Sequence, residues 1–222
     1  MSKRVKRAPE RRHERSDGGA SDEREGFRTP LPKSFYARET ETVARQLLGA
    51  ILVCRTNEGV ASGRIVETEA YLGEHDLACH AAVGRTARTD PLYGEPGTAY
   101  VYLIYGVHWC FNAVTRAVGL PSAVLVRAVE PIDGVELMRT RRGAAARAVD
   151  LTNGPGKLCQ AMAITGAHNR LSLQRPSLQI RRGDPVPDRD VEITPRIGIT
   201  QCANWPLRWV IAGNPYLSRR SS

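Results

Sequence analysis

Two carboxylates and an aromatic ring are spaced so that they would share one face of a strand. The segment 60–72 places Glu67, Glu69 and Tyr71 at every second position, with uncharged residues between them. Side chains two residues apart on a strand point to the same side. Such a face makes a poor hydrophobic core but a good wall for a polar cleft. The pattern fits equally a solvated sheet face on which both glutamates are exposed.

Aromatic residues and a histidine follow this segment. Tyr100 and Tyr102 share one face of a predicted strand, whereas Tyr105 comes three residues later beside Gly106 and would sit at a tip. Each tyrosine alone fits an ordinary sheet aromatic, and His80 alone fits a structural hydrogen-bonding role. Taken together with basic residues, these side chains are typical of the stacking platforms and phosphate clamps of nucleic-acid sites.

The segment NGPGKL resembles a phosphate loop only in part. A Walker A loop needs a glycine five residues before Gly156 and a Ser or Thr after Lys157, but Leu151 and Leu158 occupy these positions. We therefore reject nucleotide hydrolysis. The segment still fits a glycine-rich turn at a helix start, where Gly156 and Lys157 would contact a DNA phosphate.

Composition favours one globular domain with a polyanionic partner. The 222 residues carry 32 Lys or Arg against 23 Asp or Glu, a net charge of +9, which suggests nucleic acid but also fits a merely basic protein. No stretch approaches 18 apolar residues, so we expect a cytoplasmic, nucleoid-associated protein that does not enter membranes. The five cysteines lack zinc-ligand spacing, so we expect no metal and reduced, mostly buried thiols. They are Cys54, Cys79, Cys110, Cys159 and Cys202.

The chain divides at about residue 28. Residues 1–28 hold nine Lys or Arg, six Asp or Glu and few aliphatic residues, so we expect a disordered basic arm. The arm would be either a nonspecific DNA tether or an inert extension. Residues 29–222 would form the folded domain.

The remaining pattern predicts an α+β fold, a single domain with a curved antiparallel β-sheet and surrounding helices. Periodicity and end signals define the elements. A first helix would end at Gly49, and a later one would be capped by Asn153. The expected helices cover about 34–48, 132–142 and 154–164. The expected strands cover about 51–55, 60–72, 98–106, 108–115, 122–131, 178–183, 196–200 and 207–213, the first two and the next two as hairpins.

Four segments together resemble the alkyladenine (3-methyladenine) DNA glycosylase family of bacteria and animals. They are GRIVETEAYLGEHDLACHA, PGTAYVYLIYGVHWCFNAVT, VLVRAVEP and NGPGKLCQA. The resemblance covers about 33–218 in the family's order, and the pairing of VETEAY with YVYLIYG is highly specific. The loop GRTARTDPLYGEPG departs from the eukaryotic versions, which puts its DNA contacts in doubt.

The resemblance implies a role for each matching position. Glu69 matches the catalytic carboxylate, and Arg127 matches an arginine that holds the water and the flipped nucleotide. Tyr105 matches the tyrosine that wedges into the duplex, and Asn112 the side chain that rejects the guanine 2-amino group. The positions that match contacts to the flipped base are Tyr71, His80, Tyr102, Asn112, Ile197 and Gly198.

The implied activity is hydrolysis of the N-glycosidic bond of an alkylated or deaminated purine, without a cofactor. A carboxylate would stabilise the oxocarbenium character of the sugar and deprotonate the attacking water. Lyase chemistry would need an amine, and only Lys33 and Lys157 lie in the expected domain. We therefore expect a monofunctional, monomeric enzyme that acts on double-stranded DNA containing damaged purines. The alternative is a non-catalytic protein that binds damaged DNA or structured RNA, which would have no use for an acid at Glu69.

Overall fold

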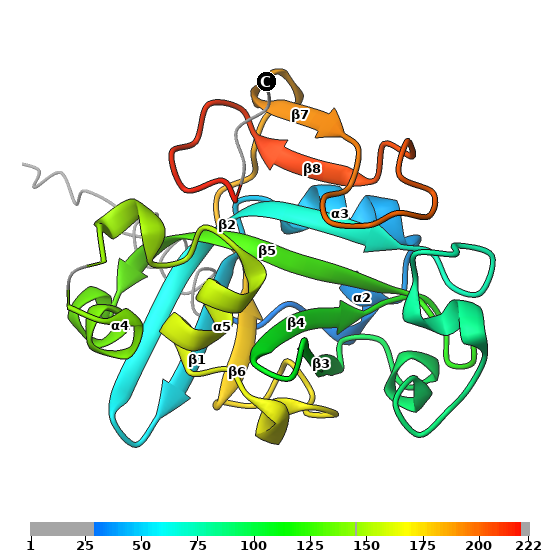
Figure 1. Ribbon diagram of the computed structural model, residues 1–222, viewed down its shortest axis with the longest axis horizontal. Helices are drawn as coiled ribbons and strands as arrows, with labels where there is room; N and C mark the ends of the chain where they lie inside the picture. The colour runs from blue at the N-terminus through cyan, green and yellow to red at the C-terminus, as the bar shows by residue number, and fades with distance from the viewer. Residues whose placement is uncertain (1–28, 145, 219–222) are drawn as a thin grey trace, which may run out of the picture.

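A curved antiparallel sheet forms the centre of the molecule (Figure 1). The computed structural model describes residues 29–144 and 146–218. The basic arm expected over 1–28 lies outside the described residues. With helices packed around one antiparallel sheet, the α+β prediction is confirmed.

The sheet has eight strands in the order β3-β4-β5-β2-β1-β6, with β8 beside β2 and β7 beside β8. Every pairing is antiparallel. The strands are β1 (Ile51–Thr56), β2 (Gly59–Tyr71), β3 (Ala99–Ile104), β4 (His108–Val114), β5 (Ala123–Asp133), β6 (Leu178–Arg181), β7 (Val191–Thr194) and β8 (Arg208–Ile211).

Short helices cover the sheet and connect its strands. In Figure 1, α3 lies behind β2 and α5 in front of β5. The α-helices are α2 (Lys33–Tyr36), α3 (Thr40–Leu47), α4 (Val135–Arg142) and α5 (Pro155–Met162). The 3₁₀ helices are η1 (His80–Val83), η2 (Asp90–Tyr93), η3 (Ala148–Asp150), η4 (Gly166–His168) and η5 (Asp188–Asp190).

Strand β2 positions the polar site because it is long enough to pair with three neighbours. One edge pairs with β5, while the other pairs first with β1 and then, at Glu67 to Glu69, with β8. The β2–β5 register shifts on either side of Glu67, so that Arg127 has no partner across the pair. Such bulges re-aim side chains. Arg127 is thereby placed on the face that carries both glutamates.

The opposite face of β2 is anchored to the core. The Thr68 hydroxyl donates to the backbone oxygen of Ala44 in α3 (2.9 Å). Val43 and Leu47 of α3 are fully buried in the same apolar cluster as Phe111 of β4. This face is therefore held against a helix, and the glutamates point the other way.

Most predicted elements are confirmed, including both hairpins. The single first helix is wrong, because the chain bends at Arg38 and forms α2 and α3. The Arg38 Nε donates to the Phe35 oxygen (2.8 Å) and the guanidinium stacks on the Phe35 ring. An arginine that binds a last-turn carbonyl ends the helix there. Gly49 does follow α3 in the left-handed region, at φ 86°.

Two further expectations are wrong. Asn153 does not cap α5, since Gly154 occupies the N-cap position and the Asn153 oxygen accepts a hydrogen bond from Lys157 instead. Residues 196–200 form no strand, because the Ile197 N–H donates to the Glu69 carboxylate and not to a neighbouring strand. The strand in this region is β7.

The cysteine prediction is confirmed within the described residues, where all five thiols are free and only Cys202 is partly exposed. No helix in 29–144 or 146–218 is both long and apolar enough to cross a membrane.

Candidate active site

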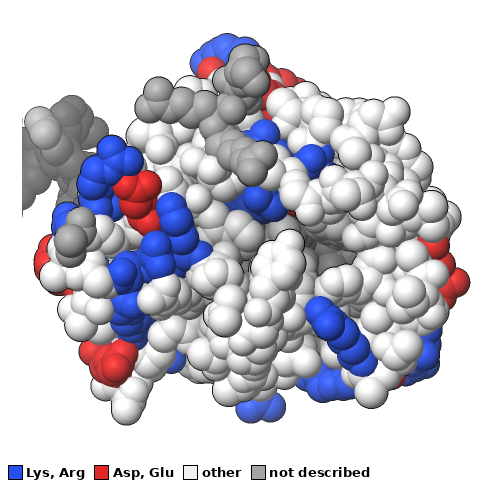
Figure 2. Space-filling view, in the orientation of Figure 1, with Lys and Arg blue, Asp and Glu red and all other residues white. Residues whose placement is uncertain are grey.

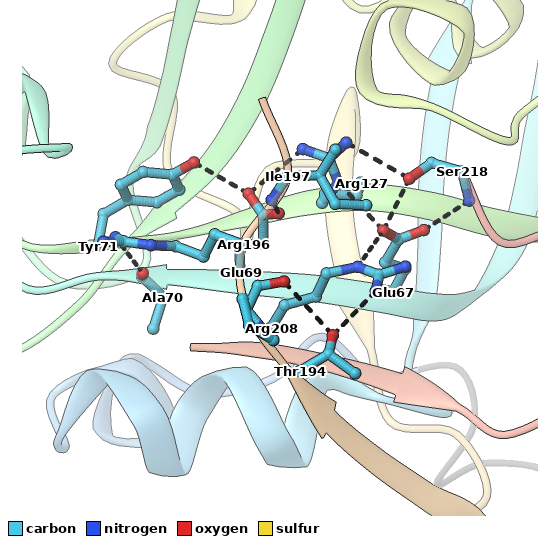
Figure 3. A network of polar contacts seen from close by, with 11 residues as sticks. Glu67, Glu69, Ala70, Tyr71, Arg127, Thr194, Arg196, Ile197, Arg208 and Ser218 are labelled. Carbon is cyan, nitrogen blue, oxygen red and sulfur yellow. Dashed lines mark hydrogen bonds and ion pairs between the residues drawn. The ribbon is translucent and has the colours of Figure 1, made fainter. Parts of the chain in front are cut away.

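Glu69 lies at the centre of a buried polar network (Figure 3). Its Oε2 accepts hydrogen bonds from the Tyr71 hydroxyl (2.9 Å) and from Arg127 Nη1 (3.2 Å). Its Oε1 accepts from the Ile197 N–H (2.8 Å). Burial raises the pKa of the Glu69 carboxyl, against the opposing effects of Arg127, the Ile197 N–H and the Tyr71 hydroxyl. The solvated-face interpretation is therefore wrong, because Glu69 is 0% exposed.

Glu67, on the same face, holds the network in place. It accepts from Arg127 Nε (3.1 Å), Arg208 Nε (2.7 Å) and both the N–H and hydroxyl of Ser218 (2.7 Å each). Arg127 thus bridges the two glutamates. Burial alone would lower the pKa of Arg127, but both carboxylates raise it and the net shift is upward. The guanidinium is therefore a fixed positive charge.

A second buried ion pair joins three separate segments. Arg196 donates to both carboxylate oxygens of Asp76 (2.5 and 2.8 Å) and to the Ala70 oxygen (3.0 Å). Its guanidinium lies 4.7 Å from the centre of the Tyr71 ring. Arg196 immediately precedes Ile197, so the pair holds the Ile197 N–H against Glu69. This use of the backbone explains why the segment is not a strand.

A cavity of about 220 Å³ opens beside Glu69. Its walls come from the end of β2, from β3, β4 and the first half of β5, and from the segments 78–80 and 197–199, with single residues from η2 and α5. Seven of the residues predicted for the site line it. They are Tyr71, His80, Tyr102, Asn112, Arg127, Ile197 and Gly198. The carboxylate of Glu69 lies directly behind Tyr71, Arg127 and Ile197.

The aromatic residues of the cavity pack on one another. The His80 and Tyr102 rings lie 4.4 Å apart and nearly edge to face. The His80 Nδ1 and the Tyr100 hydroxyl are 2.8 Å apart. Burial lowers the pKa of His80, and the charge of Arg88 lowers it further. His80 is therefore neutral at pH 7.

Asn112 is fixed by one of its two polar groups. Its Nδ2 donates to the Tyr100 oxygen (3.1 Å), and the side chain is buried at the cavity wall. The bond holds the carboxamide in one orientation, with its remaining hydrogen-bonding capacity available to a ligand.

Tyr105 lies outside the cavity, at the tip of the β3–β4 hairpin. It is 86% exposed and adopts a φ of 52°, followed by Gly106 at 72°. Two successive residues with positive φ form the tight turn that suits a hairpin. The preceding residue, Ile104, lines the cavity. Tyr105 therefore follows directly after a residue of the cavity wall, at the exposed tip of the hairpin.

The start of α5 borders the cavity through Pro155. A Cβ on Gly156 would meet His108 at 3.1 Å, so this glycine allows close packing. Lys157 Nζ bonds to Asn153 Oδ1 (2.8 Å) and does not line the cavity. The phosphate contact predicted for Gly156 and Lys157 stays a prediction. Figure 2 shows basic side chains gathered over α4 and the start of α5. The last turn of α4 carries Arg139, Arg141 and Arg142.

Sequence reasoning missed the residues that support Glu69. Arg196, Arg208 and Ser218 lie outside the four segments that carry the resemblance, and Asp76 lies within the first of them but was given no role. They reach the site from 72–80 and 194–218. The one available signal was the position of Arg196 next to Ile197. Within the residues described, no group of three or more His, Cys, Asp or Glu is placed to hold a metal.

Comparisons with known proteins agree with this geometry. A family model described as Methylpurine-DNA glycosylase (MPG) matches residues 34–215. A protein of Myxococcus xanthus named "Putative 3-methyladenine DNA glycosylase" is 51% identical over 85% of this chain and 93% of its own length. Relatives with the same name in Salinibacter ruber and Carboxydothermus hydrogenoformans are 49% and 44% identical, each over 86% of this chain and over 98% and 99% of their own lengths.

Proposed function

The chain belongs to the methylpurine-DNA glycosylase family, and we propose that it flips a damaged purine out of duplex DNA and hydrolyses the glycosidic bond with a water activated by Glu69. As a family member it is a DNA repair enzyme that hydrolyses N-glycosyl bonds. We assign this activity to a domain formed by residues 29–222, acting as a monomer. The observation that carries the proposal is the position of Glu69 directly behind an aromatic cavity, bonded to three residues that line it.

The cavity would hold the flipped base between aromatic rings. Tyr71 comes from the end of β2, whereas His80 and Tyr102 pack together from η1 and β3. Extruding a base costs a few kcal/mol, and each stacking contact returns about 1 to 3 kcal/mol. Tyr105 would fill the space that the base leaves. Stacking and the Tyr105 wedge together would offset the free-energy cost of flipping. This cost is smallest for damaged bases, which pair and stack poorly in the duplex.

Glu69 has the capacity to bind one catalytic water. A carboxylate offers about four acceptor positions, and Tyr71, Arg127 and Ile197 use three of them. A water on the remaining position would donate to the carboxylate and present its lone pair to C1′ of the sugar. As the bond to the purine breaks, its electron pair leaves with the base, and the ionised carboxylate stabilises the oxocarbenium charge. The water oxygen then bonds to C1′, the carboxylate takes the proton that the water releases, and this proton passes on to the departing purine. Arg127 fixes the carboxylate's orientation and contacts the nucleotide.

The nucleophile is a water rather than an amine. Lys33 and Lys157 are the lysines within the described residues, and neither lines the cavity. Lys33 pairs with Glu95, and Lys157 bonds to Asn153. A Schiff base with the sugar would require a free amine inside the cavity. The product is therefore an abasic site in an intact strand.

The competing function is non-catalytic binding of damaged DNA or structured RNA. A binder would not need to bury a carboxylate at the cost that desolvation imposes. Three donors hold Glu69 in a single orientation, which is the arrangement that a general base requires. We therefore favour the enzyme.

Glu69→Gln tests the proposal, because it removes the base and keeps the shape. We expect single-turnover release of hypoxanthine from a duplex to fall at least about 10²-fold, with lesion-DNA affinity within a few-fold of the unmodified protein. Glu192→Gln, an exposed glutamate on β7, is the matched control and should excise normally. Near-normal excision by Glu69→Gln would refute the mechanism.

A further inference from the structure

We propose that Glu67 is a positioning residue for the reaction: it shares the charge of Arg127, so that Glu69 stays an effective base although a guanidinium is bonded to it. The inference rests on the proposed function and deepens it, because it assigns a role to a residue that does not line the cavity. It depends on how two carboxylates divide one arginine between them.

Arg127 is held between two carboxylates on the same face of β2 (Figure 3). Its Nε donates to Glu67 Oε1 (3.1 Å), and its Nη1 donates to Glu69 Oε2 (3.2 Å). Both glutamates are fully buried and the arginine is 8% exposed, so water and salt screen these charges only weakly. Neither carboxylate therefore has the guanidinium to itself.

Glu67 is bonded as a carboxylate anion. Besides Arg127, it accepts hydrogen bonds from the Arg208 Nε and from both the N–H and the hydroxyl of Ser218. Two of these four donors are guanidiniums, and an ionised carboxylate is the form that only accepts. Glu67 therefore places a second negative charge beside Arg127.

The second charge matters because a general base works best when its pKa lies near the working pH. Burial has the largest effect on Glu69 and raises its pKa, whereas Arg127, the Ile197 N–H and the Tyr71 hydroxyl lower it. The charge of Glu67 raises the pKa of Glu69 as well. An arginine paired with Glu69 alone would hold the carboxylate in place but weaken it as a base. With Glu67 present, Arg127 orients Glu69 at a smaller loss of basicity.

The other titratable groups on and behind the cavity wall do not take over this role. They are Tyr71 of β2, His80 of η1, Tyr102 of β3, Cys110 of β4, Arg208 of β8 and the buried pair Arg196–Asp76. Burial raises the pKa of the tyrosines and the thiol and lowers that of the imidazole, so all four are uncharged at pH 7. The Arg196–Asp76 pair is neutral as a whole, and Arg208 bonds to Glu67.

Glu67→Gln tests the inference, because it removes the charge and nearly keeps the shape. The measurement is single-turnover excision of hypoxanthine from a duplex, at saturating enzyme, over a series of pH values. Loss of a like charge lowers the pKa of Glu69, so the rate should fall at a lower pH than in the unmodified protein. A carboxylate that shares a site raises its neighbour's pKa by roughly one unit or more, so we expect the midpoint to move down by about one pH unit.

Ser218→Ala is the matched control. It removes a hydrogen bond from the same carboxylate and leaves every charge in place. Its midpoint should equal that of the unmodified protein, whatever happens to the maximal rate. A shift in Glu67→Gln but not in Ser218→Ala would assign the effect to charge rather than to a loosened network.

A double variant keeps the test decisive if Glu67→Gln alone does not fold. Removing Glu67 leaves the buried Arg208 without this carboxylate, and an uncompensated buried charge is strongly destabilising. Combining Glu67→Gln with Arg208→Met removes both members of that ion pair. The charges that remain are still paired, Arg127 with Glu69 and Arg196 with Asp76. We expect the same downward shift of the midpoint in the double variant.

The outcomes are distinguishable. A slower reaction with an unmoved midpoint would make Glu67 a structural support only and overturn the inference, as would an upward shift. In either case the proposed function stands as long as excision is lost in Glu69→Gln. Excision by the unmodified protein that did not depend on Glu69 would overturn both proposals.

Discussion

Replacing Asp76 by Asn should destabilise the protein strongly, although no substrate group need touch this residue. The carboxylate is fully buried and receives two hydrogen bonds from Arg196. The carboxamide is nearly isosteric, but it leaves the Arg196 charge uncompensated and turns an amide donor toward a guanidinium donor. Breaking a buried pair by removing one partner costs about 3 to 5 kcal/mol. For a domain of this size, that lowers Tm by roughly 6 to 20 °C.

The pH dependence adds a second readout. Burial alone raises the pKa of Asp76, but hydrogen bonds from Arg196 and from the Leu72 and Ala78 N–H groups lower it, and the net pKa lies below its ordinary value. A folded-state pKa below the unfolded one gives stability that is present above the unfolded pKa, about 3.9, and is lost as pH falls through the folded pKa. The stability gap between the unmodified protein and Asp76→Asn should therefore narrow below about pH 4.

The assay is urea unfolding at pH 7 and at several values down to pH 3. Asp188→Asn is the matched control, because Asp188 pairs with Arg45 at the surface, where ion pairs contribute little. A loss of under about 1 kcal/mol in Asp76→Asn at pH 7 would refute the assignment of this pair as the anchor of the Ile197 segment. If the difference in unfolding free energy between the unmodified protein and Asp76→Asn stayed constant down to pH 3, the charge of Asp76 would not be its cause.

Three further predictions concern the reaction itself. The rate of single-turnover excision should fall at low pH with a midpoint above the ordinary pKa of a glutamate, because burial raises the pKa of Glu69 and the base must be ionised. Arg127→Met should move this midpoint to higher pH, since Arg127 lowers the pKa of Glu69. A midpoint that Arg127→Met left unchanged would argue against Glu69 as the titrating base. Tyr105→Ser should slow excision from duplex DNA roughly tenfold or more and slow excision from single-stranded DNA much less. The difference between the two losses should correspond to about the stacking free energy of one aromatic ring. Equal losses on both substrates would exclude the wedge role of Tyr105. Borohydride reduction during turnover should trap no covalent adduct with DNA, and strands should break only after hot alkali; an adduct that disappeared in Lys157→Ala would contradict a water nucleophile.

Local patterns predicted the parts of the fold that local forces determine. The alternation along 60–72 placed Glu67, Glu69 and Tyr71 on one face, and all three meet in the network. The hairpin around Gly106 placed Tyr105 at a tip, where it is exposed. In both cases the spacing of residues close in sequence decides the geometry.

Long-range contacts determined what the sequence could not predict. The segment around Arg196 has the alternation of a strand, but Asp76 lies 120 positions earlier and draws the arginine inward. The break at Arg38 is the exception, because it depends on a local hydrogen bond to the Phe35 oxygen that helix propensity does not predict. Burial of the glutamates also depends on β8 and Ser218, which are far away in sequence.

The buried network orients the groups around Glu69 more than it stabilises the fold. Three carboxylates and three guanidiniums in a protein interior contribute little net stability, since well-packed apolar residues of similar volume are often equally stable or better. The ion pairs instead hold side chains in fixed orientations, because each bidentate or bridging arginine binds two carboxylate oxygens at once. Arg127 orients Glu69 from β5, and Arg196 orients the Ile197 N–H from the segment after β7. The general base that we propose, Glu69, would have to meet a flipped nucleotide in one orientation, and such supports would hold it there.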